Sequence, residues 1–266
     1  ITNATQEDGD LNFGSRPYPT WCWKTGTAFT NDASATGVGS IDSAGSVNTD
    51  AGFSIVSWTG TASNGTIAHG LGSVPKMIIV KNRDGTQGWG VYHASLGNTK
   101  YLQLNADAAA GTASTFWNNT TPTSSVFSIG TSGWMNDSSN KYIAYIFSDV
   151  KGYSKFSSYI GNGNADGTFI YTGFKPAFIL AKCSSASGDW VITDVKRNTY
   201  NPLSKRLFPS LTNAESTTNN WYDALSNGFK ARLNDGTHNG SGKTYIYMAF
   251  AESPFVTSTG IPATAR

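Results

Sequence analysis

The sequence is poor in the residues that carry most protein chemistry. Charged residues make up only 14% of the 266 positions, and there are two cysteines and three histidines. Cys22 and Cys183 are too few for a disulfide framework, and neither has a second Cys or a His at ligand spacing. We therefore expect two unpaired thiols, no metal site and no cofactor.

Long apolar runs and clusters of one charge are also missing. No stretch approaches 18 uninterrupted apolar residues, the net charge is only +2, and the basic residues are scattered along the chain. These features predict neither a membrane span nor a nucleic-acid partner. The chain opens at Ile1 without an initiator Met or a signal pattern, which is typical of a fragment or a processed product.

Glycine and aromatic residues are abundant. The chain has 29 Gly, and Phe, Trp and Tyr together make up 13% of it. So many aromatic side chains can bury enough apolar surface to offset the entropy of the unfolded chain, which excludes disorder as the main state. Leu, Glu, Lys and Arg are too scarce to sustain the heptads of a coiled coil.

An internal repeat organises the chain. A set of seven positions recurs at a constant offset of 101 residues, without a gap. Trp58, Gly60, Gly72, Pro75, Ile78, Lys81 and Trp89 return as Tyr159, Gly161, Gly173, Pro176, Ile179, Lys182 and Trp190. A repeat of this length indicates two copies of one module.

Each copy consists of short β segments separated by turn dipeptides such as Asn64-Gly65 and Asp166-Gly167. We predict an all-β fold with two homologous tandem β-sandwich (jelly-roll-like) modules, at residues 52–150 and 151–256, and an extended N-terminal segment. The closing runs Tyr142–Phe147 and Tyr245–Phe250 are apolar at nearly every position, which predicts burial on both faces. Helical periodicity is weak and is best at 105–110 and 213–225.

The remaining segments are polar. Residues 1–24 end in a Trp-Cys-Trp alternation typical of the last strand of an upstream module, and residues 257–266 form a C-terminal tail. Residues 25–51 are mainly Ser, Thr, Ala, Gly and Asp, so we predict a polar linker without a core. A linker of this length is uncommon inside one domain, and we expect it to be ordered against a neighbouring chain in a homo-oligomer.

Three strings carry a resemblance to known proteins. Residues 52–60 read GFSIVSWTG, residues 69–81 read HGLGSVPKMIIVK, and residues 91–97 read VYHASLG. They resemble a repeated, uncharacterised module in virion proteins of marine tailed bacteriophages, especially cyanophages. The resemblance covers roughly residues 50–266. It implies a particle component with no established activity, and by analogy a trimer.

The exposed aromatic side chain expected to bind a ligand is Trp134. Two pairs of tryptophans, Trp89 with Trp190 and Trp117 with Trp221, keep their place in both copies, as core packing demands. Trp134 occurs once, in a polar loop before the closing strand. Sugar recognition uses an aromatic face flanked by polar side chains. We therefore predict a binding site made of Trp134, Asn136 and Asp137 with Asp235 and His238 from the matching loop of the second copy; a structural role for Trp134 is the alternative.

Catalytic residues are not predicted. The three glutamates, Glu7, Glu215 and Glu252, are far apart, and the three histidines have no triad spacing. We expect a non-enzymatic virion protein, a tail-fibre or head-fibre component that contacts other virion proteins and adheres to a glycan or protein of the host surface. The alternatives are a secreted bacterial carbohydrate-binding protein and a glycan-cleaving fibre.

Overall fold

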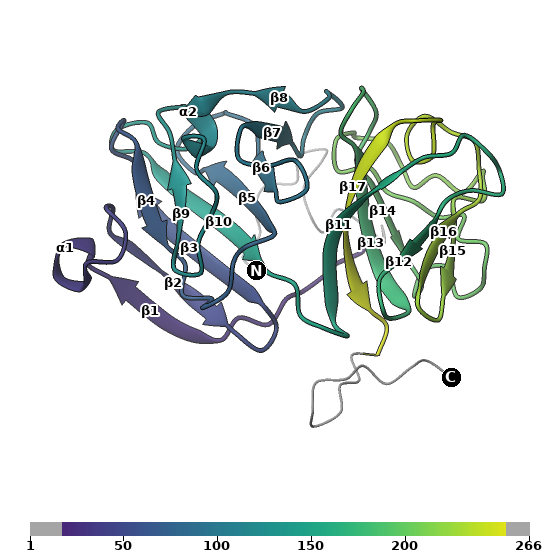
Figure 1. Ribbon diagram of the computed structural model, residues 1–266, viewed down its shortest axis with the longest axis horizontal. Coiled ribbons are helices and arrows are strands. Elements are labelled where there is room, and N and C mark those ends of the chain that lie inside the picture. Colours follow the sequence, from purple (N-terminus) through teal and green to yellow (C-terminus); the bar gives the residue numbers. More distant parts are fainter. Residues whose placement is uncertain (1–17, 254–266) are drawn as a thin grey trace, which may run out of the picture.

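The computed structural model describes residues 18–253, and in that range the chain is almost entirely β-structure. The strands form four sheets with antiparallel pairing, and both helices of this range are only four residues long. Figure 1 shows two β-sandwiches side by side, one from each half of the chain. No helix among the described residues is long and apolar enough to cross a membrane. The predicted all-β fold of two sandwich modules is confirmed.

Module 1 is a sandwich of a large sheet and a two-stranded sheet. The large sheet continues the order β3-β10-β5-β6 into β7 and β8, and the small sheet pairs β4 with β9. The elements are β3 (Phe53–Thr59), β4 (Gly65–Ala68), β5 (Met77–Asn82), β6 (Gly90–His93), β7 (Lys100–Gln103), β8 (Gly111–Thr112), α2 (Ser114–Trp117), β9 (Val126–Ile129) and β10 (Lys141–Phe147).

Module 2 repeats this arrangement. Its large sheet has the order β11-β17-β13-β14, which matches β3-β10-β5-β6, and its second sheet pairs β12 with β16 as β4 pairs with β9. The duplication is thus confirmed at the level of strand order. The elements are β11 (Ser154–Ile160), β12 (Phe169–Tyr171), β13 (Pro176–Cys183), β14 (Val191–Asp194), β15 (Tyr222–Leu225), β16 (Gly228–Ala231) and β17 (Thr244–Ala251).

The repeated aromatic residues pack in the same way in both cores. Trp58 stacks on Tyr142 at 5.5 Å between ring centroids, and Tyr159 stacks on Tyr245 at 5.0 Å, with an interplanar angle of 15° in each pair. Of the repeated tryptophans, Trp117, Trp190 and Trp221 are at most 2% exposed, as predicted for core residues. Trp89 is half-buried.

Residues 25–51 are not a linker, and this prediction is wrong. They form β1 (Thr27–Asn31), α1 (Ala33–Thr36) and β2 (Ser43–Asn48), and β2 pairs with β3 along its own whole length. The segment needs few apolar residues because backbone pairing with an existing sheet stabilises it. Residues 25–51 were expected to be ordered against a neighbouring chain because they lack a core of their own. Since they pair with their own module, they no longer provide an argument for an oligomer.

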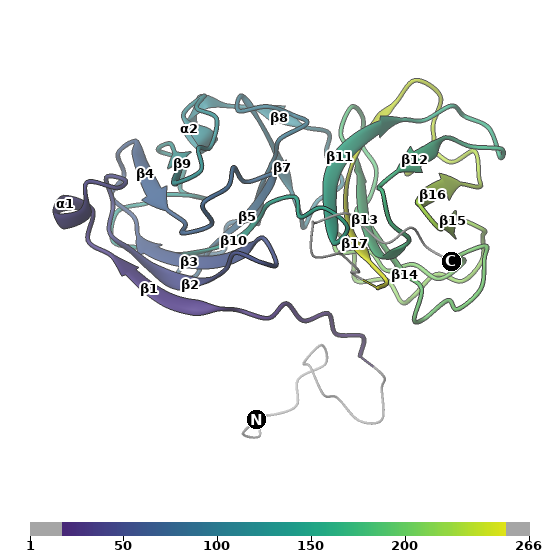
Figure 2. The same ribbon diagram turned by 60° about the horizontal axis from the view of Figure 1, so that its bottom comes forward.

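Residues 18–26 contain no strand, so the predicted last strand of an upstream module is absent from this described part. In Figure 2 the segment leaves β1 and runs toward module 2. Trp21 packs against Phe178 at 5.6 Å and Trp23 against Phe250 at 5.6 Å. Residues 1–17 and 254–266, with the rest of the N-terminal segment and the predicted tail, lie outside the described residues.

Neither segment with helical periodicity is a helix. Residues 105–110 have no regular structure and bond to module 2, where the Ala110 N–H donates to the Ser184 carbonyl at 2.9 Å. Residues 213–225 end in β15. Both cysteines are free, as expected, with Cys22 exposed and Cys183 buried.

The two large sheets pack against each other through an apolar cluster from both modules, including Phe53, Ile79, Phe147, Phe178 and Met248. Buried hydrogen bonds cross this interface. The His93 ring lies 3.2 Å from the Tyr247 carbonyl, and the buried Lys182 amine donates to the Asp107 carbonyl at 3.1 Å. Burial lowers the Lys182 pKa to about 8. Each module thus has its own apolar cluster, and a third cluster at the interface joins the two modules.

The interface decides which closing strand is buried on both faces. In β17 every residue from Tyr245 to Phe250 is buried, as predicted. In β10 the prediction is wrong for Ile143 and Tyr145, which are only half-buried. Ile143 has no place in the interface cluster, whereas its counterpart Ile246 belongs to it.

Candidate functional site

The structure places the predicted loop of module 1 in a structural role. Asn136 is completely buried and its side chain bonds to the backbone of Thr61, Ser63 and Gly130. Trp134 is half-buried and packs edge-on against Phe116 at 5.7 Å. The exposed ligand contact predicted for Asn136 is therefore wrong, and Trp134 follows the alternative of packing on its own module.

The half-buried Asp137 uses its backbone N–H to donate to the Tyr142 hydroxyl at 2.7 Å. The same hydroxyl donates to the Gly133 carbonyl at 2.9 Å. In module 2 the Tyr245 hydroxyl accepts from the Gly240 N–H at 2.8 Å and donates to Gly236 at 2.7 Å. Both loops are thus folded around a tyrosine of the closing strand.

The matching loop of module 2 also turns its polar groups inward. His238 is 0% exposed, and its ring makes T-shaped contacts with the rings of Trp221 and Tyr222. Its Nδ1 is 3.4 Å from the Asp235 carboxylate. Burial lowers the His238 pKa, and the bond to His238 holds the Asp235 pKa well below its usual range. The prediction that His238 faces a ligand is wrong; Asp235 is half-buried and holds the loop.

The buried Asn239 repeats the role of Asn136. Its side chain accepts from the Asn162 N–H and donates to the carbonyls of Asn164 and Leu233. The two loops differ in sequence but share this central asparagine, because several backbone groups in each need a buried partner.

Replacing Asn136 or Asn239 with alanine is expected to lower the free energy of unfolding by about 2 kcal/mol each. Each change leaves several buried backbone groups without a hydrogen-bond partner. Urea denaturation measures the loss. Asn140→Ala is the control, since its half-buried side chain makes no comparable set of bonds. A loss no larger than the control's would contradict the structural role.

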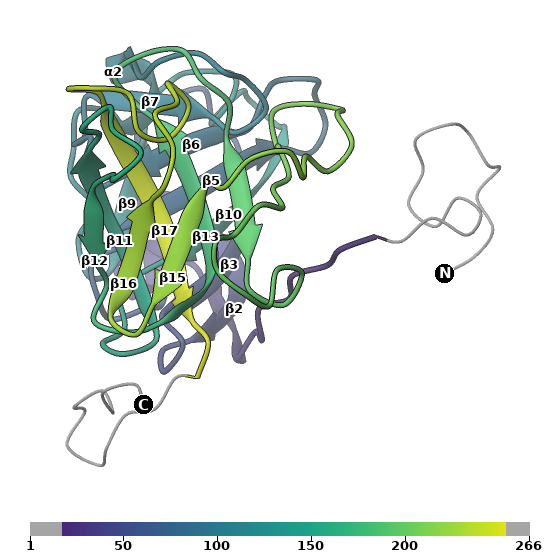
Figure 3. The ribbon, with the colours of Figure 1, turned by 90° about the vertical axis from the view of Figure 1, so that its right-hand side faces the viewer.

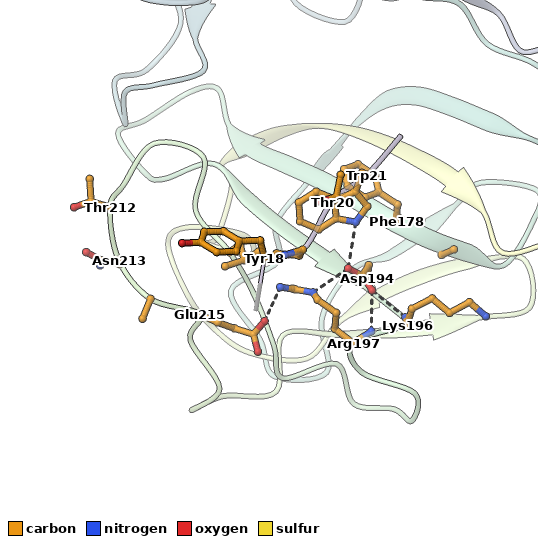
Figure 4. A pocket seen from close by; sticks show the side chains of 14 residues that line it. Tyr18, Thr20, Trp21, Phe178, Asp194, Lys196, Arg197, Thr212, Asn213 and Glu215 are labelled. Atoms are coloured by element: carbon orange, nitrogen blue, oxygen red, sulfur yellow. Dashed lines mark hydrogen bonds and ion pairs between the residues drawn. The ribbon is translucent and has the colours of Figure 1, made fainter. Parts of the chain in front are cut away.

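A cleft of about 1060 Å³ lies on module 2, where residues 18–21 approach the end of β14 and residues 212–215 (Figure 4). Trp21 and Tyr18 come from the N-terminal segment, and Tyr18 is 41% exposed. Asp194 and Arg197 come from the turn after β14, and Glu215 comes from the facing loop. Segments far apart in the sequence therefore build the cleft together.

Asp194 organises the floor of the cleft. One carboxylate oxygen accepts the backbone N–H groups of Lys196 and Arg197, both at 2.9 Å, which closes a tight turn. The other accepts the Arg197 Nε at 2.9 Å and the Trp21 indole N–H at 3.3 Å. Since Asp194 ends a strand, this turn fixes the Arg197 side chain relative to the sheet.

Arg197 links the N-terminal segment on one side of the cleft to the loop of residues 212–215 on the other. Its Nη1 forms an ion pair with Glu215, and its guanidinium lies 5.7 Å from the Trp21 ring centroid. The side chains of Asp194, Arg197 and Glu215 are 8%, 17% and 30% exposed. Thr212 and Asn213 lie beyond them on the same loop (Figure 4). The result is an aromatic wall beside a fixed row of hydrogen-bonding groups.

This chemistry suits binding of a polar ligand with apolar faces. Aromatic rings pack on such a face while carboxylate, guanidinium, amide and hydroxyl groups fix its orientation. Four donors already occupy the Asp194 carboxylate, whereas a glycoside hydrolase needs two carboxyl groups free to act on the substrate. Within residues 18–253 no group of three or more His, Cys, Asp or Glu side chains is placed to hold a metal ion.

Sequence reasoning missed this site. It treated Trp21 as part of a strand and Glu215 as isolated, and it gave Asp194 no role. The sequence carries one usable signal, because the repeated aromatic positions stop at Trp190 and resume only at Trp221. Module 1 has β7, β8 and α2 at the corresponding place, and module 2 has no helix or named strand between β14 and β15.

The fold and the cleft define a tandem β-sandwich protein with a ligand-sized cleft on its second module. The family model described as a domain of unknown function (DUF7483) matches residues 1–254, so the chain belongs to this family. Comparison with curated proteins and with solved structures found no match.

Proposed function

We propose that the chain is a non-enzymatic structural component of a bacteriophage particle, a tail or head fibre, and that the cleft of module 2 binds a saccharide of the host surface. The observation that carries the saccharide proposal is the aromatic wall of Tyr18 and Trp21 beside the Asp194, Arg197 and Glu215 network. The sequence resemblance supports the place on an extracellular particle.

The packing of the two modules against each other supports a role as a structural component. Apolar packing and buried hydrogen bonds join the two modules, so the module that carries the cleft is held firmly against module 1. A single shallow saccharide site binds weakly, and many copies on a particle raise the apparent affinity about 100-fold or more. A fibre anchored to other virion proteins provides such copies.

Tyr18→Ala is expected to weaken saccharide binding about tenfold, because it removes an aromatic face. Glu215→Gln should weaken binding as well by replacing a carboxylate acceptor. Binding is measured on a glycan array and then by calorimetry with the best saccharide. Trp134→Ala is the matched control, since Trp134 packs on module 1, outside the cleft.

Equal binding by wild type and both cleft variants would overturn the saccharide site. Release of reducing sugar from the bound saccharide would identify a glycan-cleaving fibre instead. Antibody labelling of purified particles tests the virion assignment independently. Absence of the chain from particles, together with retained saccharide binding, would favour a secreted carbohydrate-binding protein.

A further inference from the structure

The two modules differ at one side of the sandwich, where β3 and β4 of module 1 correspond to β11 and β12 of module 2. In module 1 the chain itself covers this side. Strand β2 pairs with β3, and the N–H groups of Ser40 and Ile41 donate to the Thr66 carbonyl in β4. In module 2 no described residue forms such a strand, and β17 is the one strand that pairs with β11 in the described range, apart from an isolated bridge between Val150 and Ser154 at the start of β11.

The open edge of β11 is accessible. Figure 3 shows β11 and β12 at one margin of the molecule. Ser158 in the middle of β11 is exposed, and Ile160 at its end is 63% exposed, among the highest values for a large apolar residue in the described range. An exposed edge strand presents a row of unpaired backbone groups that can pair with another chain.

The hydrogen bonds identify which backbone groups face outward. The Gly161 N–H donates to Lys243 on the β17 side, whereas the Phe156 N–H donates to the Asp149 carboxylate at 2.8 Å and the Ile160 carbonyl accepts from the Thr168 hydroxyl at 2.7 Å. Because backbone direction alternates along a strand, the groups of Phe156, Ser158 and Ile160 face the edge.

Four of these edge groups have no hydrogen-bond partner within residues 18–253: the Phe156 carbonyl, both groups of Ser158 and the Ile160 N–H. We propose that two copies of the chain pair through β11, antiparallel, about a two-fold axis at Ser158. This register sets Ser158 opposite Ser158 and Phe156 opposite Ile160. The four open groups of each copy then meet their complements.

The two groups that are bonded internally also face each other in this register. The Phe156 N–H of one copy lies opposite the Ile160 carbonyl of the other, so the pair exchanges the Asp149 and Thr168 bonds for direct backbone bonds. The Asp149 side chain is 28% exposed and also forms an ion pair with Lys155, so it keeps a partner when it swings outward. The contact uses the same surface of both copies and closes at two.

Cross-linking tests the axis. In a Cys22→Ser background, which removes the exposed thiol, Ser158→Cys places two thiols opposite each other. Directly opposed residues of a hydrogen-bonded pair are about 5.5 Å apart between Cα atoms, within the range of a disulfide. Oxidation is expected to convert most of the protein to a disulfide-linked dimer, whereas the neighbouring control Ser157→Cys should give little.

Backbone variants test the hydrogen bonds. Ser158→Pro removes an outward N–H that has no internal partner and should reduce the sedimenting mass from two chains to one at about 50 μM. Ser158→Ala keeps the N–H and should stay dimeric. If the proline variant unfolds, hydrogen exchange on the wild type decides: the Ser158 and Ile160 N–H groups should exchange at least tenfold more slowly in concentrated than in dilute protein.

A wild type that sediments as a monomer at 50 μM, or equal cross-linking of the two cysteine variants, would overturn the pairing. So would a trimer of the kind that the sequence resemblance implies, because this two-fold contact cannot generate one. The saccharide cleft is separate from this edge, so loss of the dimer with retained saccharide binding refutes this inference alone.

Discussion

Replacing Ile246 with aspartate is expected to lower the free energy of unfolding by about 4 kcal/mol or more. Ile246 is 1% exposed in β17 and belongs to the apolar cluster between the modules. The change removes a packed apolar side chain and puts a carboxylate among buried apolar groups. Lys182 lies opposite in β13, but its amine already donates to the Asp107 and Cys183 carbonyls. Urea denaturation of purified protein at neutral pH measures the loss.

Ile143→Asp is the matched control. Ile143 occupies the equivalent position of β10, since Tyr142 and Tyr245 both stack on the first repeated aromatic residue of their module. It is half-buried and outside the interface cluster, so its aspartate can reach water, and the expected loss is about 1 kcal/mol. Equal losses in the two variants would show that the modules do not cover Ile246.

Lowering the pH from 7 to 4 is expected to reduce the free energy of unfolding by about 3 kcal/mol through His93 alone. His93 is fully buried at the interface, and burial, with the nearby positive charge of Lys76, lowers its pKa to about 4 despite its bond to the Tyr247 carbonyl. An unfolded chain takes up this proton near pH 6.5. Stability is therefore fully present above pH 6.5 and falls as the pH drops toward 4.

Other titratable groups also lower the free energy of unfolding as the pH falls. Burial also lowers the pKa values of His69 and His238, and the bond from His238 holds the Asp235 pKa down. Urea denaturation at pH 7, 5.5 and 4 measures the slope. His93→Gln, which keeps a side-chain donor and acceptor without a proton to gain, should remove a large share of it. An unchanged slope in this variant would contradict the assignment to His93.

The duplication and much of each core can be predicted from the order of the amino acids alone. Gly60, Pro75 and Trp89 recur at one offset because turns, strand entries and packed aromatic residues tolerate little change of spacing. The all-β fold is therefore readable from local signals, since turn dipeptides and short apolar runs act over a few residues.

The conformation of the polar segments could not be predicted in this way, because it depends on contacts between distant parts of the chain. Residues 43–48 have no apolar pattern, yet they form a strand because the edge of β3 offers backbone partners. Asn136 and His238 looked like surface groups but are buried. Asn136 bonds to loop backbone groups far away in the sequence, and the His238 ring packs against Trp221 and Tyr222. The cleft joins Trp21 to Asp194, 173 positions apart, and no local signal reports a contact that only the folding of the whole chain brings about.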